Sequence, residues 1–316
     1  MIRWGFIGCG DVVEHKSGKP FWVPEQSEVV AVASRQIANA KAFAARHNIP
    51  SYYDDAAQLI ANPAVDAIYV ATPPSTHMPY AMQALAAGKP VYVEKPMGIT
   101  LVECQAAVTL AKEKAVPLLV AYYRRSLPYY HKVKALLAMG EIGQIQAVHL
   151  THFVAPQGQS APAWKRDAAF AGGGLFYDVG CHALDVLDFI FGEITQVGGS
   201  SQNVACQTVL DDAVAAQFTF ASGVVGTALW CFESGLNEDA IQVIGTKGRL
   251  TFHVFGNEMM LETAAGTQQI TVASPTYMQA PMIANILAHL QGVAQADCTG
   301  EVALRTAQVM EQIVMS

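Results

Sequence analysis

The stretch IRWGFIGCG, residues 2–10, decides what fold to expect. A short apolar run ends here in two glycines, Gly8 and Gly10, separated by one residue. Glycines directly after a strand let the backbone turn tightly and approach a pyrophosphate, whose charge then lies at the start of a helix. The pattern is interpreted as a dinucleotide-binding turn, and the alternative is an ordinary tight turn, because G-x-G triplets also arise by chance.

The residues that follow favour the first interpretation. Apolar, β-branched runs alternate with alanine-rich helical stretches up to about residue 120, which is typical of a parallel sheet covered by helices on both faces. The predicted strands are 2–7, 29–33, 66–71, 90–93 and 117–120, and the predicted helices are 37–47, 78–87 and 101–114. The glycine pair therefore lies in the first strand–helix junction of a predicted α/β sheet.

The pattern changes after residue 122. A helix is predicted over 127–139, and from residue 145 strand-like runs follow one another with one helical interruption near 177–191. Such a run indicates a mixed or antiparallel sheet. The predicted strands are 145–154, 195–206, 212–220, 223–232, 240–245 and 248–255, and two helices close the chain at 280–294 and 300–315. We therefore predict a dinucleotide-binding domain at 1–121 and a second domain at 122–316.

Composition narrows the class of protein. With 316 residues, of which 52% are hydrophobic and 14% charged, the chain has material for two packed domains and is too apolar for disorder. A formal net charge of −7 disfavours broad binding of nucleic acid or anionic lipid. The sequence has no membrane span or signal-peptide pattern, and its six cysteines are scattered without a C-x-x-C pair. We expect a cytoplasmic protein with no metal site, no nucleic-acid partner and no membrane partner.

The end of the second predicted strand bears on the choice of dinucleotide. NAD sites usually have an acidic residue there, but this chain has Ser34 and Arg35. A hydroxyl and a guanidinium can bind a 2′-phosphate, so NADP is favoured over NAD. The alternative is that Arg35 is a solvated residue at the start of a helix.

Two further strand ends carry candidate residues. The loop ATPPSTH, residues 71–77, follows the third strand, and ligands of open α/β sheets bind outside such ends. The simpler interpretation is a loop with a helix cap at Ser75 or Thr76. The predicted cofactor-binding residues are Gly8, Cys9, Gly10, Asp11, Val12, Ser34, Arg35, Thr72, Pro73, Pro74, His77, Glu94 and Lys95.

Glu94, Lys95 and Pro96 follow the fourth strand. A lysine just outside a buried strand is unusual, because burial disfavours its charge unless a partner compensates. Lys95 could donate a hydrogen bond to a substrate oxygen, with Glu94 or the cofactor holding it in place. A surface salt bridge at the strand end is the alternative.

The segment GGGLFYDVGCH, residues 172–182, is the densest candidate. Asp178 and His182 are four residues apart, which on an α-helix places both side chains on one face. The aspartate could then raise the basicity of the histidine, as a general base requires. A helix-terminal aspartate beside a core histidine is the alternative. His149 and His152 fall on opposite faces of a predicted strand and are interpreted as structural.

Together these motifs resemble the family of glucose–fructose oxidoreductase, inositol 2-dehydrogenase and the rhizopine-catabolism protein. The resemblance spans essentially the whole chain. It rests on the early G-x-G, the ATPPSTH loop, AGKPVYVEKP, GGGxxxDxGxH and the closing TGEVALRT helix. The departures are Val13 in place of a third small residue and the unusual DVVEHKSGKPFW leader at 11–22.

The resemblance implies a Rossmann domain followed by an α+β domain with a large open, mainly antiparallel sheet. The exposed face of that sheet would form the contact between copies of the chain in a homodimer or homotetramer. It implies that Lys95 is the catalytic lysine, that His182 is the acid/base and that Asp178 assists it. Arg125, Trp164 and Lys165 would contact substrate, as would the three catalytic residues.

The activity that this resemblance implies is hydride transfer between NADP or NAD and a secondary alcohol or ketone of a sugar, polyol or similar cyclic substrate. The alternatives are an NAD-dependent glycosidase that oxidises its substrate transiently, and a cofactor-binding sensor without catalysis. A sensor would have no need of the Lys95, Asp178 and His182 set.

Overall fold

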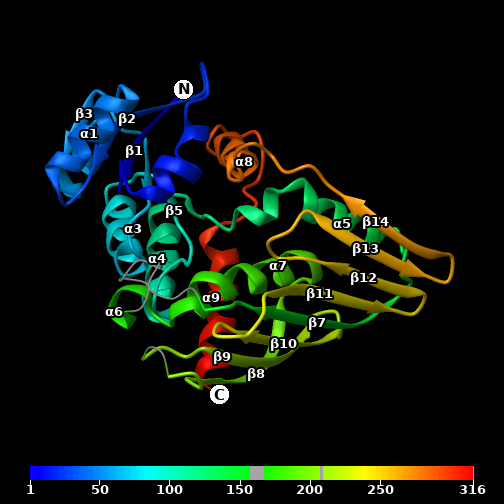
Figure 1. The fold of residues 1–316 in the computed structure, drawn as a ribbon. Helices are drawn as coiled ribbons and strands as arrows, with labels where there is room; N and C mark the ends of the chain where they lie inside the picture. Colours follow the sequence, from blue (N-terminus) through cyan, green and yellow to red (C-terminus); the bar gives the residue numbers. More distant parts are fainter. Residues whose placement is uncertain (157–166, 207–208, 316) are drawn as a thin grey trace. The chain divides into compact units, whose positions relative to one another are not determined.

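The computed structural model describes residues 1–156, 167–206 and 209–315 (Figure 1). The chain folds into two compact units. The first unit contains Met1–Ser126 and Pro275–Leu304, and the second contains Leu127–Ser274 and Arg305–Ser316. This division differs from a single cut after residue 121, because the chain returns to the first unit late in the sequence.

The first unit is built on a six-stranded parallel sheet with the order β3-β2-β1-β4-β5-β6. The strands are β1 (Ile2–Ile7), β2 (Ser27–Ala33), β3 (Ser51–Tyr53), β4 (Ala67–Val70), β5 (Val91–Val93) and β6 (Leu118–Val120). This is the strand order of the doubly wound dinucleotide-binding fold, in which a crevice opens where the order reverses, between β1 and β4. The predicted Rossmann sheet is confirmed.

The helices of this unit are α1 (Ile37–His47), α2 (Ala56–Ala61), α3 (His77–Ala86), α4 (Leu101–Lys114) and α8 (Ala280–Leu290). Helices α3 and α4 lie side by side (Figure 1). Helix α4 begins where Thr100 and Glu103 form a reciprocal capping box, which satisfies two backbone N–H groups of its first turn. The short β3 and α2 were not predicted, because three and six residues are too few to show a period.

An aromatic cluster fills the core on one face of this sheet. Phe6 of β1 packs edge-on against Tyr69 of β4, with ring centroids 5.2 Å apart, and Tyr69 stacks on Tyr92 of β5 at the same spacing. Phe21, which precedes β2, lies 4.9 Å from both Phe6 and Tyr69. These rings are fully buried, so the two tyrosine hydroxyl groups must find partners inside the protein.

The late segment Pro275–Leu304 is tied to the edge of the same sheet. The Val120 N–H donates to the carbonyl of Cys298 at 3.2 Å, and Leu119 forms a β-bridge with Thr299. Lys112 of α4 pairs with Glu301. Backbone pairing at β6 is therefore the reason why this segment belongs to the first unit.

The second unit is built on an eight-stranded, mainly antiparallel sheet with the order β14-β13-β12-β11-β7-β10-β9-β8, in which only the β7–β10 pair is parallel. The strands are β7 (Ile145–Phe153), β8 (Ile194–Gln202), β9 (Ala213–Phe220), β10 (Val225–Cys231), β11 (Glu238–Gly245), β12 (Gly248–Phe252), β13 (Glu258–Thr263) and β14 (Gly266–Thr271). Its helices are α5 (Pro128–Ala138), α6 (Ala168–Ala171), α7 (Cys181–Phe191) and the end of α9 (Gly300–Met315). The predicted sheet is confirmed, although β13 and β14 were not predicted.

Burial alternates along the central strands of this sheet. In β9 and β10 the side chains of Val214, Phe218 and Trp230 are buried, whereas those of Gln217 and Leu229 are exposed. Helix α7 covers the buried face through a ring contact of Phe191 with Phe220, at 5.2 Å between centroids. In the described residues of this unit, the other face of the sheet is open, and side chains on it such as Gln217 and Leu229 are exposed within the unit.

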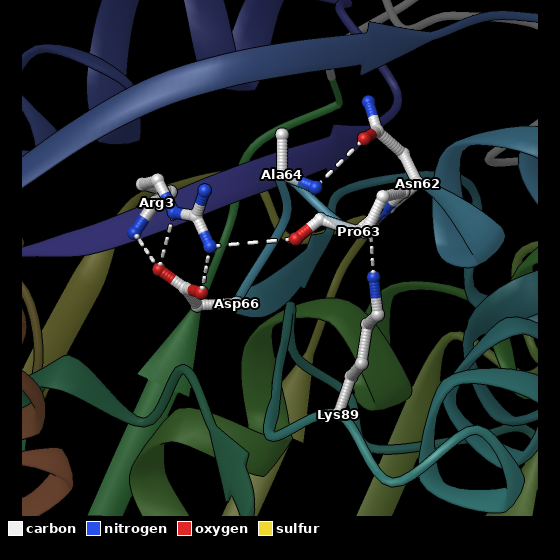
Figure 2. A network of polar contacts seen from close by, with 6 residues as sticks. All are labelled: Arg3, Asn62, Pro63, Ala64, Asp66 and Lys89. Carbon is white, nitrogen blue, oxygen red and sulfur yellow. Dashed lines mark hydrogen bonds and ion pairs between the residues drawn. The ribbon is translucent and has the colours of Figure 1, made fainter.

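An ion-pair network holds the amino ends of β1 and β4 together (Figure 2). Arg3 donates to both carboxylate oxygens of Asp66, at 2.6 and 2.9 Å, and to the carbonyl of Pro63 at 3.4 Å. Lys89 donates to the carbonyl of Asn62 at 2.6 Å. The hydrogen bond from Arg3 holds the pKa of the Asp66 carboxyl below its ordinary value. The network lies at the amino ends of β1 and β4, whereas Gly8 and the loop 71–77 follow their carboxyl ends.

None of the helices in the described residues combines the length and the apolar character that crossing a membrane requires.

Candidate active site

The strand register aligns the predicted site residues of the first unit along one edge of the sheet. Ile7 of β1 pairs with Ala33 of β2 and with Val70 of β4, and Val70 pairs with Val93 of β5. The next residue of each strand therefore lies in one row at the carboxyl edge. That row consists of Ser34, Gly8, Ala71 and Glu94.

The turn at Gly8 requires glycine. Its φ is +105°, and a Cβ at this position would lie 2.4 Å from the carbonyl oxygen of Ala71. A Cβ at Gly10 would meet nothing within 4 Å, so the backbone there borders open space. This tight turn with an accessible backbone fits the pyrophosphate of a dinucleotide.

The segment after the turn explains the departure at Val13. Val13–Ser17 forms a π-helical turn, and the N–H groups of Val13 and Glu14 donate to the carbonyl of Gly10 at 3.0 Å. Val13 is buried, so it contributes to the core of the first unit. Glu14 pairs with Arg46 of α1 at 2.8 Å, which fixes the turn to the first helix.

The end of β2 presents Ser34 and Arg35 as predicted. Ser34 is half-buried. Burial raises the pKa of the neighbouring Cys9 thiol, while the side chain of Ser34 and the charge of Arg46 oppose the rise. Arg35 is exposed to solvent. Its guanidinium is therefore accessible to an anionic group outside the strand end.

His77 has a more specific place than the loop motif suggested. Its ring is buried, with Nε2 2.8 Å from the carbonyl oxygen of Thr72 and Nδ1 2.8 Å from that of Pro96. Burial lowers the pKa of the ring, and the two carbonyls act in the opposite direction. His77 therefore joins the ATPPSTH loop to the turn that carries Lys95. Thr76 does not cap α3 through its side chain but bonds to Thr72 and to the carbonyl of Pro73.

Glu94 is a buried carboxylate at the end of β5. Its Oε1 accepts hydrogen bonds from the hydroxyl of Tyr69 at 2.7 Å and from the amide of Gln279 at 2.8 Å. Its Oε2 accepts from the backbone N–H of Lys95 at 3.2 Å. Three donors thus satisfy a charge that would be costly to bury alone. One of them is the peptide group of the predicted catalytic lysine.

The network around Glu94 reaches two other parts of the first unit. The Tyr69 hydroxyl also lies 2.7 Å from Oγ of Ser17, at the end of the turn that follows the glycine pair. Gln279 lies just before α8, and its side-chain oxygen accepts from Tyr92 at 2.9 Å. Burial raises the pKa of both tyrosines well above the ordinary value, so they remain donors at neutral pH.

Sequence reasoning missed Ser17, Tyr69 and Gln279. The signal for Tyr69 was a hydroxyl in an otherwise apolar buried strand, opposite Tyr92 in the predicted neighbour. No local pattern marks Gln279, because its partner Glu94 is 185 positions away. Lys95 is half-buried and is followed by a cis peptide bond to Pro96.

Arg125 lies in the first unit, in a 3₁₀ turn at Tyr123–Ser126, and is buried. The neighbouring Ser126 hydroxyl bonds to Asp297, and it approaches the sulfur of Met282 at 3.5 Å. The late segment of the chain therefore fixes this turn as well as Glu94. The other two predicted substrate contacts, Trp164 and Lys165, lie outside the described residues.

In the second unit, the predicted 177–191 helix is present, but its first turn is π-helical, so Asp178 and His182 do not share one regular α-helix. Asp178 lies in a π-helical turn at Phe176–Gly180, and His182 is the second residue of α7. Gly180 permits this turn, because a Cβ there would lie 2.6 Å from the ring of Phe176. That ring packs edge-on against Trp230 of β10 at 5.1 Å. Core packing therefore accounts for the irregular turn.

His182 is buried, with 4% of its surface exposed. Its ring is perpendicular to that of Phe255, at 5.9 Å between centroids. On β7, His149 is exposed and lies 2.9 Å from the Thr227 hydroxyl, whereas His152 is buried. These two histidines point to opposite faces of the strand.

Two family models cover most of the chain. The model of the oxidoreductase family with an NAD-binding Rossmann fold matches residues 2–122, and that of the GFO/IDH/MocA C-terminal domain matches residues 130–251. An oxidoreductase of Formosa agariphila is 32% identical over 98% of this chain and 97% of its own length.

Other relatives have more specific names. Trans-1,2-dihydrobenzene-1,2-diol dehydrogenase of Mus musculus is 32% identical over 78% of this chain and 73% of its own length. A solved structure of levoglucosan dehydrogenase in complex with NADH and levoglucosan has a TM-score of 0.88 and 22% identity, and covers 100% of this chain and 96% of that one. This last likeness shows the fold.

Proposed function

Because the chain belongs to the GFO/IDH/MocA family of oxidoreductases, we propose that it transfers a hydride between a nicotinamide dinucleotide and a secondary alcohol or ketone of a sugar, polyol or similar cyclic compound. The observation that carries the proposal is the row of strand ends. It aligns the glycine turn at Gly8 with the Glu94–Lys95 turn on one edge of one sheet. Relatives named for cyclic diol and anhydrosugar substrates support the substrate class.

The residues of the first unit fit a nicotinamide dinucleotide. Gly8 and Gly10 would take the pyrophosphate, and the ATPPSTH loop would border the nicotinamide half. When bound, the nicotinamide supplies the hydride acceptor or donor. The protein contributes orientation and a fixed electrostatic environment.

The same row supplies the group that stabilises developing charge. Lys95 donates a hydrogen bond to the reacting oxygen of the substrate and stabilises its alkoxide character. The peptide N–H of Lys95 is held by Glu94 Oε2, which limits the freedom of the turn. Glu94 thus positions Lys95, and His77 positions the ATPPSTH loop against the turn that carries Lys95. Arg125 contributes a positive charge for substrate hydroxyl groups.

His182 moves the proton. In the oxidative direction it takes the hydroxyl proton of the substrate, and in the reductive direction it returns it. A histidine suits this task near neutral pH because its ordinary pKa is about 6.5. Asp178, one turn earlier in the chain, assists by favouring the protonated ring.

The preferred dinucleotide is NADP. Ser34 and the exposed Arg35 offer a hydroxyl and a cation where an NAD-specific site would have a carboxylate. A charged hydrogen bond contributes about 1.5–3 kcal/mol, which corresponds to a preference of roughly tenfold to a hundredfold.

The test is a screen of cyclic and open-chain sugars and polyols with NADP and NAD, followed by absorbance of the reduced cofactor. We expect turnover with at least one cyclic substrate and faster turnover with NADP. A nitrophenyl glycoside in the same screen separates the glycosidase alternative, which would release nitrophenol without net change of the cofactor. Cofactor binding without turnover of any substrate would favour the sensor.

The open face of the eight-stranded sheet is proposed to join two or four copies of the chain. Support comes from exposed apolar side chains on the central strands, including Val225 and Leu229 at 52% and 41% exposure. Light scattering of the purified protein should give the mass of a dimer or tetramer, and Leu229→Asp should shift it toward the monomer. A monomeric wild type would remove this proposal and leave the proposed activity in place.

A further inference from the structure

Phe255 is an exposed aromatic residue beside the proposed acid/base. It follows β12, exposes 50% of its surface and lies 5.9 Å from His182 between ring centroids. Single exposed apolar residues are common and need no explanation by themselves. Phe255 differs because it lies beside His182 and because hydrogen bonds hold its backbone.

Hydrogen bonds fix the backbone under Phe255. The carboxylate of Asp239 accepts from the N–H of Val254 at 2.9 Å and from the N–H of Phe255 at 2.7 Å. The hydroxyl of Tyr130 donates to the carbonyl of Val254 at 2.6 Å, and the N–H of His253 donates to the hydroxyl of Tyr129 at 3.0 Å. A loop fixed in this way loses little conformational entropy when a ligand meets it.

A second layer supports Asp239. In the β7–β11 pair Asp239 lies opposite His152, whose Nδ1 is 3.7 Å from the carboxylate. Burial acts to raise the pKa of Asp239, but His152 and the two backbone N–H groups outweigh it, so the pKa is lowered. The carboxylate is therefore charged at neutral pH and keeps both bonds. The His152 ring also lies 5.4 Å from that of Phe255.

An aromatic ring in this position matches a particular ligand chemistry. The face of the ring carries partial negative charge and attracts the polarised C–H groups of a saturated ring. A cyclic sugar or cyclitol presents several C–H groups on one rigid face, whereas an open-chain polyol must give up rotamer freedom to do so. Resting on the function proposed above, we propose that Phe255 is a stacking platform for the C–H face of a cyclic substrate, next to His182.

The test compares Phe255→Ala and Phe255→Tyr with the wild type, on a cyclic substrate found by the screen and on an open-chain polyol. We expect Phe255→Ala to raise KM for the cyclic substrate about tenfold, with kcat changed by less than about threefold. Phe255→Tyr keeps a ring and should restore the wild-type KM. Met260→Ala, which alters a side chain of similar exposure on β13, is the control.

Dinucleotide affinity, measured by fluorescence titration, should be unchanged in all three variants and verifies that they are folded. Wild-type turnover combined with an unchanged KM in Phe255→Ala overturns the platform while the proposed function stands. An equal rise of KM for cyclic and open-chain substrates also overturns it. A wild type that turns over neither kind of substrate overturns both proposals.

Discussion

Gln279 donates a hydrogen bond from its side-chain amide to Oε1 of Glu94 at 2.8 Å, across 185 positions of sequence. The late segment of the chain thereby reaches the carboxylate that holds the peptide group of Lys95. The turn of the proposed catalytic lysine is thus determined from both sides, by β5 before it and by a residue near the end of the chain.

Gln279→Leu should therefore destabilise the protein and impair catalysis. The change removes one donor from Glu94 and leaves the hydroxyl of Tyr92 without its acceptor, at a cost of about 1–3 kcal/mol in the free energy of unfolding. Urea denaturation measures this cost, and kcat should fall more than dinucleotide affinity. Gln291→Leu is the matched control. Gln291 is exposed and directly follows α8, so this change should alter the free energy of unfolding by less than about 0.5 kcal/mol. Equal behaviour of the two variants would contradict the anchoring role.

Lys95→Ala should lower kcat by at least about a hundredfold, because the transition state loses one hydrogen-bond donor. Dinucleotide affinity should change much less. Lys89→Ala, which alters a lysine just before the other end of β5, is the control for loss of a positive charge beside this strand. Near-normal turnover of Lys95→Ala would remove this residue from the mechanism.

His182→Asn should keep the fold and lose the limb of the pH–rate profile that a general base produces. The measurement is kcat/KM across the range from about pH 5 to pH 9, around the ordinary histidine pKa. His149→Asn, on the open face of the second sheet, should leave the profile unchanged. If His182→Asn retains the wild-type profile, another group is the base, and Tyr177 is the next candidate.

Arg35→Ala should narrow the difference in affinity between NADP and NAD, mainly by weakening the binding of NADP. Wild type should bind NADP about tenfold or more tightly than NAD, as expected for one charged hydrogen bond. Lys41→Ala on the exposed side of α1 controls for the general loss of positive charge. Equal affinities in the wild type, or a preference for NAD, would mean that Arg35 does not contact the cofactor.

Asp66→Asn should show a pH-dependent loss of stability. The pKa of Asp66 is lowered in the folded state by Arg3, so the stabilisation is present above the unfolded pKa of about 3.9 and is lost as pH falls through the folded value. Both side chains are 39% exposed, and such pairs contribute little, so the Tm at pH 7 should fall by no more than about 3 °C. The difference from wild type should shrink as the pH falls below the unfolded pKa and disappear once the pH is below the folded pKa of Asp66. A difference that persists there would assign the effect to packing.

Local patterns were sufficient to predict much of the fold. The bounds of α1, α4 and α9 were predicted to the residue, because each has a full helical pattern, and the strand ends that carry Gly8 and Lys95 were also predicted. The predictions failed where the cause is not local. The polar strand β14 pairs at the edge of its sheet, and the turn at Asp178 depends on the packing of Phe176 against Trp230.

The candidate site was also predictable only in part. The residues at the carboxyl edge of the first sheet could be found because each follows an apolar strand, whereas the groups that hydrogen-bond to the site come from distant segments. Ser17 and Gln279 bond to Tyr69 and Glu94 only in the folded chain. Buried polar groups need partners, but a sequence does not state which segment provides them.

The chain passes between its two units three times, after Ser126, after Ser274 and within α9 after Leu304. Neither unit is therefore a contiguous module that recombination could transfer in one piece. A fragment ending at residue 126 would contain the glycine turn and Lys95 but would lack Gln279. A functional chimera within this family would have to exchange the early and the late segments together, so these two stretches are expected to evolve as one inherited unit.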